Sequence, residues 1–238
     1  MTTRRAWLAC AVAGVLAFAA SFLFGRIPEL RPCGPSGGLG AVLAFEFART
    51  SADVAALFGA EPCRSGLIAA QRTAALLDGL WFIPAYTTFL IMAVMASARV
   101  GRGWPPAVML LASILAFAGF ADEVEGGLLW LILATLPGSE TLVAALWWPV
   151  HVKFALLAIG TAGIGGQLVG HGRRVPFRAS GIGVAIMGAI ALLRLVQGEV
   201  AGMMLAFTIG WVGLLAIAIA GCALGNDPRR PERDGVDA

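Results

Sequence analysis

Long apolar stretches, separated by shorter polar segments, dominate the chain. Six of them are each close to the roughly 20 residues that a helix needs to cross the hydrocarbon layer of a bilayer. The six stretches are residues 7–24, 79–99, 106–127, 146–168, 179–197 and 201–224. No stretch alternates like a strand. The pattern therefore predicts an all-α integral membrane bundle of six transmembrane helices, forming one membrane domain over residues 1–238.

The longest polar segment, residues 26–77, lies between the first two stretches and predicts a short helical cap on the outer face. Residues 39–49 are apolar on one side and predict a helix lying along the interface. Thr50 and Asp53 have the spacing of a capping box and predict the start of a second short helix. A third helix is expected to begin near residue 65 and to run into the second transmembrane stretch, with a kink at Pro84.

The composition agrees with a membrane location. Hydrophobic residues make up 59% of the 238 residues and charged residues only 13%, whereas a soluble domain carries about 25% charged residues. This balance excludes a cytosolic enzyme, a nucleic-acid-binding protein and a disordered chain. The expected partners are membrane lipids, with no nucleic acid among them.

The basic residues predict the orientation of the bundle. If the N-terminus is cytoplasmic, ten of the 17 basic residues fall on the cytoplasmic side, which is the side that Lys and Arg favour in membrane proteins. We therefore expect a bacterial inner-membrane protein with both termini in the cytoplasm and residues 225–238 as a cytoplasmic tail. The ten are Arg4, Arg5, Arg99, Arg102, Arg173, Arg174, Arg178, Arg229, Arg230 and Arg233.

The first stretch has two interpretations. Arg4 and Arg5 followed by an apolar run loosely resemble a twin-arginine export signal, and Ala17-Phe18-Ala19 has the small residues of a cleavage site. The apolar run continues to Phe24, which is longer than the 7–15 residues of a signal core. We therefore expect a retained anchor, with cleavage as the alternative.

Two cysteines fall in the predicted cap. Cys33 and Cys63 each lie next to a proline, and the expected topology places them in an oxidising compartment, where disulfides persist. They form either a disulfide or two unrelated loop thiols. Sequence alone does not fix the pairing.

No catalytic or metal-binding motif is complete. Residues 34–38, G-P-S-G-G, match G-x-S-x-G and the GxSG of rhomboid proteases, but a nucleophile elbow needs a strand–turn–helix context. A Gly/Ser turn is the simpler interpretation. Asp122, Glu125 and His151 would suit a metal, but the second histidine lies on the opposite side of the membrane. We expect no metal and no cofactor.

Ionisable side chains gather at the outer ends of the apolar stretches. A charge in hydrocarbon costs about 2.5–3.5 kcal/mol, so such residues usually face the bundle interior or water. They form either one polar pocket or a set of boundary charges that pair between helices. Tyr86, two turns from Asp78 on a similar face, would extend the pocket inward. The members predicted from this pattern are Asp78, Tyr86, Asp122, Glu125, His151, Lys153 and Arg194.

Three segments resemble a group of small bacterial multi-pass membrane proteins with no activity that we can assign. They are F-E-F-A-R-T at residues 45–50, D-G-L-W-F-I-P-A-Y at 78–86 and A-D-E-V-E at 121–125. Many members of the group have asparagine at the position of Gly126. The resemblance, over about residues 42–160, adds Glu46 and Arg49 to the predicted pocket.

Three functions are compatible with this pattern. The first is binding or processing of an amphipathic ligand, such as a lipid or isoprenoid, at the outer-leaflet pocket. The second is a non-catalytic scaffold or accessory subunit, and the third is a small proton-coupled transporter. Whether the protein is an enzyme stays open. Glycines suited to close helix packing would allow a homo-oligomer; they are Gly160, Gly163, Gly165, Gly166, Gly198 and Gly202.

Overall fold

A computed structural model describes residues 3–98, 105–171 and 175–224 of the chain. Arg99, Arg102, Arg173, Arg174, Arg229, Arg230 and Arg233 lie outside the described residues, so the orientation of the bundle stays a prediction. The described part is helical and contains no strand. Its elements are α1 (Thr3–Phe24), α2 (Ala41–Glu46), α3 (Ser51–Phe58), α4 (Cys63–Leu77), the π-helix η1 (Asp78–Phe82), α5 (Ile83–Ser97), α6 (Pro106–Ala134), α7 (Glu140–Ala145), α8 (Trp147–His171), α9 (Val175–Gln197) and α10 (Val200–Leu224).

Six helical segments of the described chain are long and apolar enough to cross a membrane, which confirms the predicted all-α, multi-pass bundle. They span residues 4–24, 63–97, 106–134, 140–170, 177–197 and 200–223. The second, third and fourth are longer than the apolar stretches at their cap ends. Their extra residues pack against the cap.

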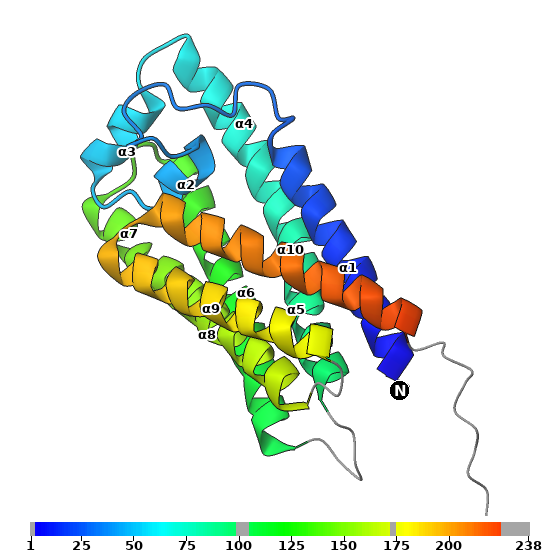
Figure 1. Ribbon diagram of the computed structural model, residues 1–238. Coiled ribbons are helices and arrows are strands. Elements are labelled where there is room, and N and C mark those ends of the chain that lie inside the picture. Colours follow the sequence, from blue (N-terminus) through cyan, green and yellow to red (C-terminus); the bar gives the residue numbers. More distant parts are fainter. Residues whose placement is uncertain (1–2, 99–104, 172–174, 225–238) are drawn as a thin grey trace, which may run out of the picture.

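The six long helices pack so that one end of the bundle carries the cap and the other the N-terminus (Figure 1). α10 runs obliquely across α1 and meets it near the end away from the cap. A Cβ atom on Gly221 of α10 would lie only 2.7 Å from the Trp7 ring of α1, so glycine permits this approach. Between α8 and α9, a Cβ on Gly188 would lie 2.8 Å from the Ala158 carbonyl oxygen.

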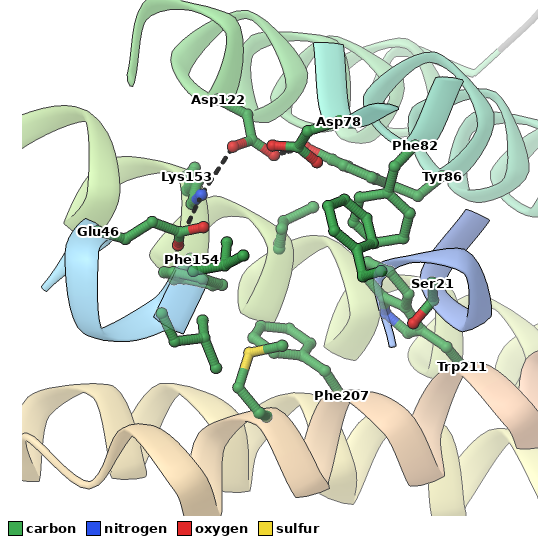
Figure 2. Close-up of a pocket in the computed structure, with 15 residues that line it drawn as sticks. Ser21, Glu46, Asp78, Phe82, Tyr86, Asp122, Lys153, Phe154, Phe207 and Trp211 are labelled. Carbon is green, nitrogen blue, oxygen red and sulfur yellow. Dashed lines mark hydrogen bonds and ion pairs between the residues drawn. The ribbon is translucent and has the colours of Figure 1, made fainter. Parts of the chain in front are cut away.

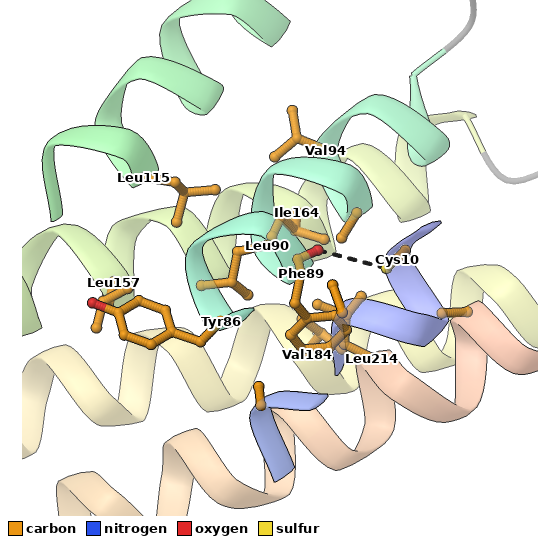
Figure 3. Packing of buried hydrophobic residues seen from close by; sticks show 14 of the residues in the cluster. Cys10, Tyr86, Phe89, Leu90, Val94, Leu115, Leu157, Ile164, Val184 and Leu214 are labelled. Carbon is orange, nitrogen blue, oxygen red and sulfur yellow. Dashed lines mark hydrogen bonds between the residues drawn. The ribbon is translucent and has the colours of Figure 1, made fainter. Parts of the chain in front are cut away.

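A large apolar core fills the bundle below the cap. Phe89, Leu90, Leu115 and Ile164 are each fully buried and belong to one contiguous cluster (Figure 3). The Cys10 thiol, also fully buried, donates to the Phe89 carbonyl oxygen at 3.6 Å. This packing makes the half of the bundle away from the cap dry and closely filled.

The cap has a small core of its own. Phe45 of α2 and Phe58 of α3 meet edge to face with their ring centroids 5.2 Å apart, and both rings are buried. Ile132 of α6 and Val143 of α7 join the same cluster. The cap therefore packs on the extended end of α6 and on α7, a short helix that the apolar pattern did not reveal.

The predicted capping box is confirmed. The Thr50 hydroxyl accepts a hydrogen bond from the Asp53 amide, and the Asp53 carboxylate accepts one from the Thr50 amide. The hydrogen bond with Thr50 is the main reason that the pKa of Asp53 is lowered from its ordinary value. The Glu140 carboxylate at the start of α7 accepts hydrogen bonds from the amide and hydroxyl of Ser51, which ties α3 to α7.

Of the two alternatives for Cys33 and Cys63, the structure has the disulfide, with their Cα atoms 5.9 Å apart. It joins the loop before α2 to the first residue of α4. The Cys33 amide also donates to the Leu57 carbonyl oxygen of α3 at 3.0 Å. The Gln71 side chain of α4 donates to the Ala41 carbonyl oxygen of α2 at 2.8 Å. These contacts hold α2 in place over the bundle.

The expected irregularity near Pro84 takes the form of a π-helical turn over residues 78–82. Proline has no amide hydrogen and its ring clashes with the carbonyl four residues earlier. The wider turn accommodates this, and the Ile83 amide donates to the Asp78 carbonyl oxygen five residues back. Such turns are frequent at functional sites, and this one begins at Asp78.

Candidate functional site

Lys153 is the centre of a buried polar cluster beneath the cap. Its ammonium nitrogen lies 3.2 Å from Glu46 Oε2, 2.7 Å from Asp122 Oδ1 and 2.8 Å from Glu125 Oε2. The Lys153 side chain is 4% exposed, so water contributes little to screening these pairs. An unpaired charge at this depth would be strongly unfavourable, and three carboxylates meet it directly.

Three elements position these groups. Asp122 and Glu125 lie one helical turn apart on α6 and face α8, where Lys153 stands in the second turn. Glu46 is the last residue of α2 and reaches down from the cap. Burial raises the pKa of the Glu46 carboxyl above its ordinary value, with the Lys153 charge opposing this shift. The cluster therefore links the cap to the bundle.

Tyr86 and Asp78 extend the cluster toward α5. The Tyr86 hydroxyl donates to Asp122 Oδ2 at 2.6 Å, and the tyrosine is 1% exposed. The Asp78 carboxylate lies beside that of Asp122 (Figure 2). Within the described part of the chain, Asp78 has no hydrogen bond or ion pair, although the charges of Asp122 and Lys153 act on it. Its oxygens are free to accept hydrogen bonds.

A cavity of about 260 Å³ opens beside this cluster. One wall carries Glu46, Asp78, Asp122 and Lys153, and almost all the rest is apolar or aromatic. The lining consists of Ser21, Phe24, Val42, Leu43, Glu46, Asp78, Phe82, Tyr86, Asp122, Lys153, Phe154, Leu157, Met204, Phe207 and Trp211. The cavity therefore has one charged end and one apolar end.

The floor of the cavity is rigidly held. Tyr86 and Trp211 stack with their ring centroids 5.6 Å apart. Tyr86 is fixed by its hydrogen bond to Asp122, and the Trp211 ring N–H donates to the Thr161 hydroxyl at 3.1 Å. Below this pair begins the filled core around Phe89. The cavity accordingly ends near the cap side of the bundle.

The cavity reaches the edge of the bundle between α1 and α10. Ser21 and Phe24 come from the cap end of α1, while Met204, Phe207 and Trp211 come from the facing part of α10. Ser21 is exposed, and Phe24 and Met204 are partly exposed. At their other ends the two helices cross closely, where Gly221 of α10 faces the Trp7 ring of α1 (Figure 1).

Three residues predicted for the pocket lie elsewhere, and the sequence-based assignment was wrong for them. Arg49 is exposed, and its backbone amide donates to Asp53 at 3.1 Å. His151 turns away, with Nδ1 2.7 Å from the Trp147 carbonyl oxygen and its ring stacked on that indole. Arg194 pairs with Glu199 at the α9–α10 turn, where the two side chains are 40% and 57% exposed. Among the described residues, no arginine lines the pocket.

The structure brings together the other six predicted residues: Glu46, Asp78, Tyr86, Asp122, Glu125 and Lys153. It adds a largely apolar lining that the sequence did not indicate. This lining includes Phe24 of α1 and Met204, Phe207 and Trp211 of α10. Met204 and Leu205 are adjacent apolar residues of α10. Met204 nevertheless lines the cavity, while Leu205 is 61% exposed. No signal in a single sequence separates the two.

Among the described residues, no group of three or more His, Cys, Asp and Glu side chains is placed to hold a metal ion. The glycines expected to support a homo-oligomer are partly used within the chain. Gly160, Gly163 and Gly165 face Leu115, Leu111 and Ala185 respectively. Self-association stays a prediction.

No protein-family model, curated protein or solved structure matches this chain. Its function must therefore be argued from the chemistry of its own site.

Proposed function

We propose that the cavity binds an amphipathic ligand, lipid-like or isoprenoid-like, that enters from the membrane. The polar head lies against Glu46, Asp78, Asp122 and Lys153, and the apolar chain leaves between α1 and α10. We further propose that the protein sits in a bacterial inner membrane with the cap on the outer side.

The observation that carries this proposal is the division of one cavity into a charged end and an apolar end. A purely structural ion-pair cluster needs no cavity beside it, because buried pairs are most stable when they are closely packed. A transporter needs a path across the membrane, whereas this cavity ends at the Tyr86–Trp211 stack above a filled core. A binding site fits the geometry best.

The depth of the cluster agrees with a head group near one membrane surface. At 1.5 Å per residue, about 28 Å of helix separates Asp78 from Ser97 at the far end of α5. This is close to the roughly 30 Å thickness of the hydrocarbon layer. A ligand head at Asp78 would thus lie at the level of the lipid head groups on the cap side.

Photoaffinity labelling tests the proposal. An alkyl amphiphile with a diazirine along its apolar chain should label peptides containing Ser21–Phe24 and Met204–Trp211. Substitution of Met204 by Trp fills the cavity, so we expect labelling of these peptides to fall at least about tenfold, since the larger indole would overlap the ligand. The labelled positions are read by mass spectrometry of proteolytic fragments.

The matched control is Leu205→Trp, which makes a comparable change on the adjacent, outward-facing residue of α10. It should leave the labelling pattern unchanged. Labelling spread evenly over all lipid-facing helices, or labelling that Met204→Trp does not reduce, would contradict a binding site in this cavity.

A further inference from the structure

At the charged end of the cavity, the hydrogen-bond donors already have protein partners, whereas one acceptor has none within the described chain. The Lys153 ammonium is already met by Glu46, Asp122 and Glu125. The Tyr86 hydroxyl donates to Asp122, and the Trp211 N–H donates to Thr161. The ammonium, phenol and indole donors around the charged end therefore already donate to protein acceptors. The Asp78 carboxylate, an acceptor with two oxygens, has no hydrogen bond within the described chain.

Acidic groups also outnumber basic groups in this cluster. Three carboxyl groups, those of Glu46, Asp122 and Glu125, contact one ammonium, the Asp78 carboxyl lies beside them, and no arginine of the described chain lines the cavity. With every group ionised, the cluster would carry an excess of three negative charges. Like charges at this depth repel strongly, because little water screens them. A positively charged ligand group would reduce this repulsion.

Asp78 is the residue best placed to meet such a group. The surrounding helices enclose its carboxylate, yet the residue is partly accessible because it faces the cavity. Its backbone begins the π-helical turn, and its side chain points toward Asp122. The close-up shows the two carboxylates together at one end of the cavity (Figure 2).

Aromatic rings form much of the remaining wall. Phe82, Tyr86, Phe154, Phe207 and Trp211 all line the cavity. Aromatic faces attract cations, and the attraction is larger where water is excluded. The same rings offer nothing to a phosphate, which requires N–H or O–H donors.

We infer that the ligand head recognised at Asp78 is a protonated amine, and that the cavity selects cationic amphiphiles over neutral and anionic ones. This inference rests on the proposed binding function and narrows it. It disfavours a phosphate-headed lipid or isoprenoid phosphate as the occupant, because the two arginines that would have met a phosphate, Arg49 and Arg194, lie outside the cavity.

A head-group series tests the inference on the wild-type chain. Decylamine, decyltrimethylammonium, decanol and decyl phosphate share one chain and differ in the head. Each is used to displace the photoaffinity label in a non-ionic detergent at neutral pH. We expect decylamine to displace it at a concentration at least about tenfold below that of decanol, with decyl phosphate the weakest competitor.

Asp78→Asn separates the charge of this residue from its shape. We expect the decylamine concentration needed for displacement to rise about tenfold, because the amide provides no negative charge, while that for decanol changes less than twofold. Glu61→Gln is the matched control, since Glu61 is an exposed acid of the cap outside the cavity lining. It should change neither value.

The outcomes distinguish the two proposals. Displacement by decyl phosphate at or below the decylamine concentration would overturn the amine inference and leave the binding site standing. Unchanged decylamine displacement in Asp78→Asn would overturn the role of Asp78. Failure of every amphiphile to displace the label would instead contradict the proposed function. The wild-type series remains decisive if Asp78→Asn does not fold.

Discussion

Replacing Lys153 by Met is expected to lower the free energy of unfolding by about 3–5 kcal/mol, which is the cost of breaking a buried ion-pair cluster by removing one partner. The substitution keeps the side-chain length but leaves Glu46, Asp122 and Glu125 without their shared cation. Unfolding in detergent, induced by heat or denaturant, measures the loss. The matched control, Arg194→Met, removes a charge from a partly exposed pair and should cost at most about 1 kcal/mol.

A second substitution should restore part of this loss. Asp122→Asn in the Lys153→Met background removes one of the unbalanced negative charges and keeps a carbonyl oxygen to accept from Tyr86. We expect a coupling free energy of about 1–3 kcal/mol between the two positions. Strict additivity of the two single changes would mean that these residues are independent boundary charges, and the polar cluster would lose its physical basis.

Removal of the Cys33–Cys63 disulfide should destabilise the cap by about 3–4 kcal/mol, because the bond closes a loop across 30 residues of sequence separation. The cap holds α2 over the cavity, so the double variant Cys33→Ser/Cys63→Ser should also bind the amphiphile more weakly. Hydrogen exchange at the amides of α2 and α3, with and without reductant, measures the loosening.

The double variant is also the control for the reductant. Dithiothreitol should increase exchange in the wild-type cap and have no effect once both cysteines are replaced, since Cys10 and Cys222 lie in the bundle. Rapid modification of Cys33 and Cys63 by a membrane-impermeant maleimide without reductant would contradict the bridge. The cap would then depend on its apolar core alone.

The transmembrane helices could be predicted from the sequence because the bilayer imposes one strong rule. A spanning segment needs about 20 apolar residues in a row, and its backbone must be hydrogen-bonded internally. The capping box at Thr50 was equally readable, because it depends on two residues three apart. The helix α7 was not found, since its sequence continues the apolar pattern of α8 and only Ser139 marks its start.

The charged part of the site was predicted by the cost of a charge in hydrocarbon, which singles out Asp78, Asp122, Glu125 and Lys153. The same rule wrongly included Arg194. This residue lies in the last turn of α9, where the chain turns at Gly198 and Glu199 pairs with it at the surface. Whether an ionisable residue points inward or along the boundary depends on the rotation of its helix.

The apolar lining could not be predicted, because it depends on how α1 and α10 tilt apart. Met204 and Leu205 are adjacent and chemically similar, and only the packed structure shows that the first faces the cavity. The stacking of Tyr86 on Trp211 joins residues 125 positions apart in the chain. Contacts of this kind follow from the whole arrangement of helices rather than from any local pattern.

The most direct test of a ligand in this cavity is the analysis of lipids that remain bound through purification. Wild-type protein, Met204→Trp and Leu205→Trp are purified identically, and the extracted molecules are quantified by mass spectrometry. We expect one class of amphiphile to be enriched over the bulk membrane in the wild type and in Leu205→Trp, and to be lost from Met204→Trp. The same bulk lipid mixture in all three samples would contradict the binding site.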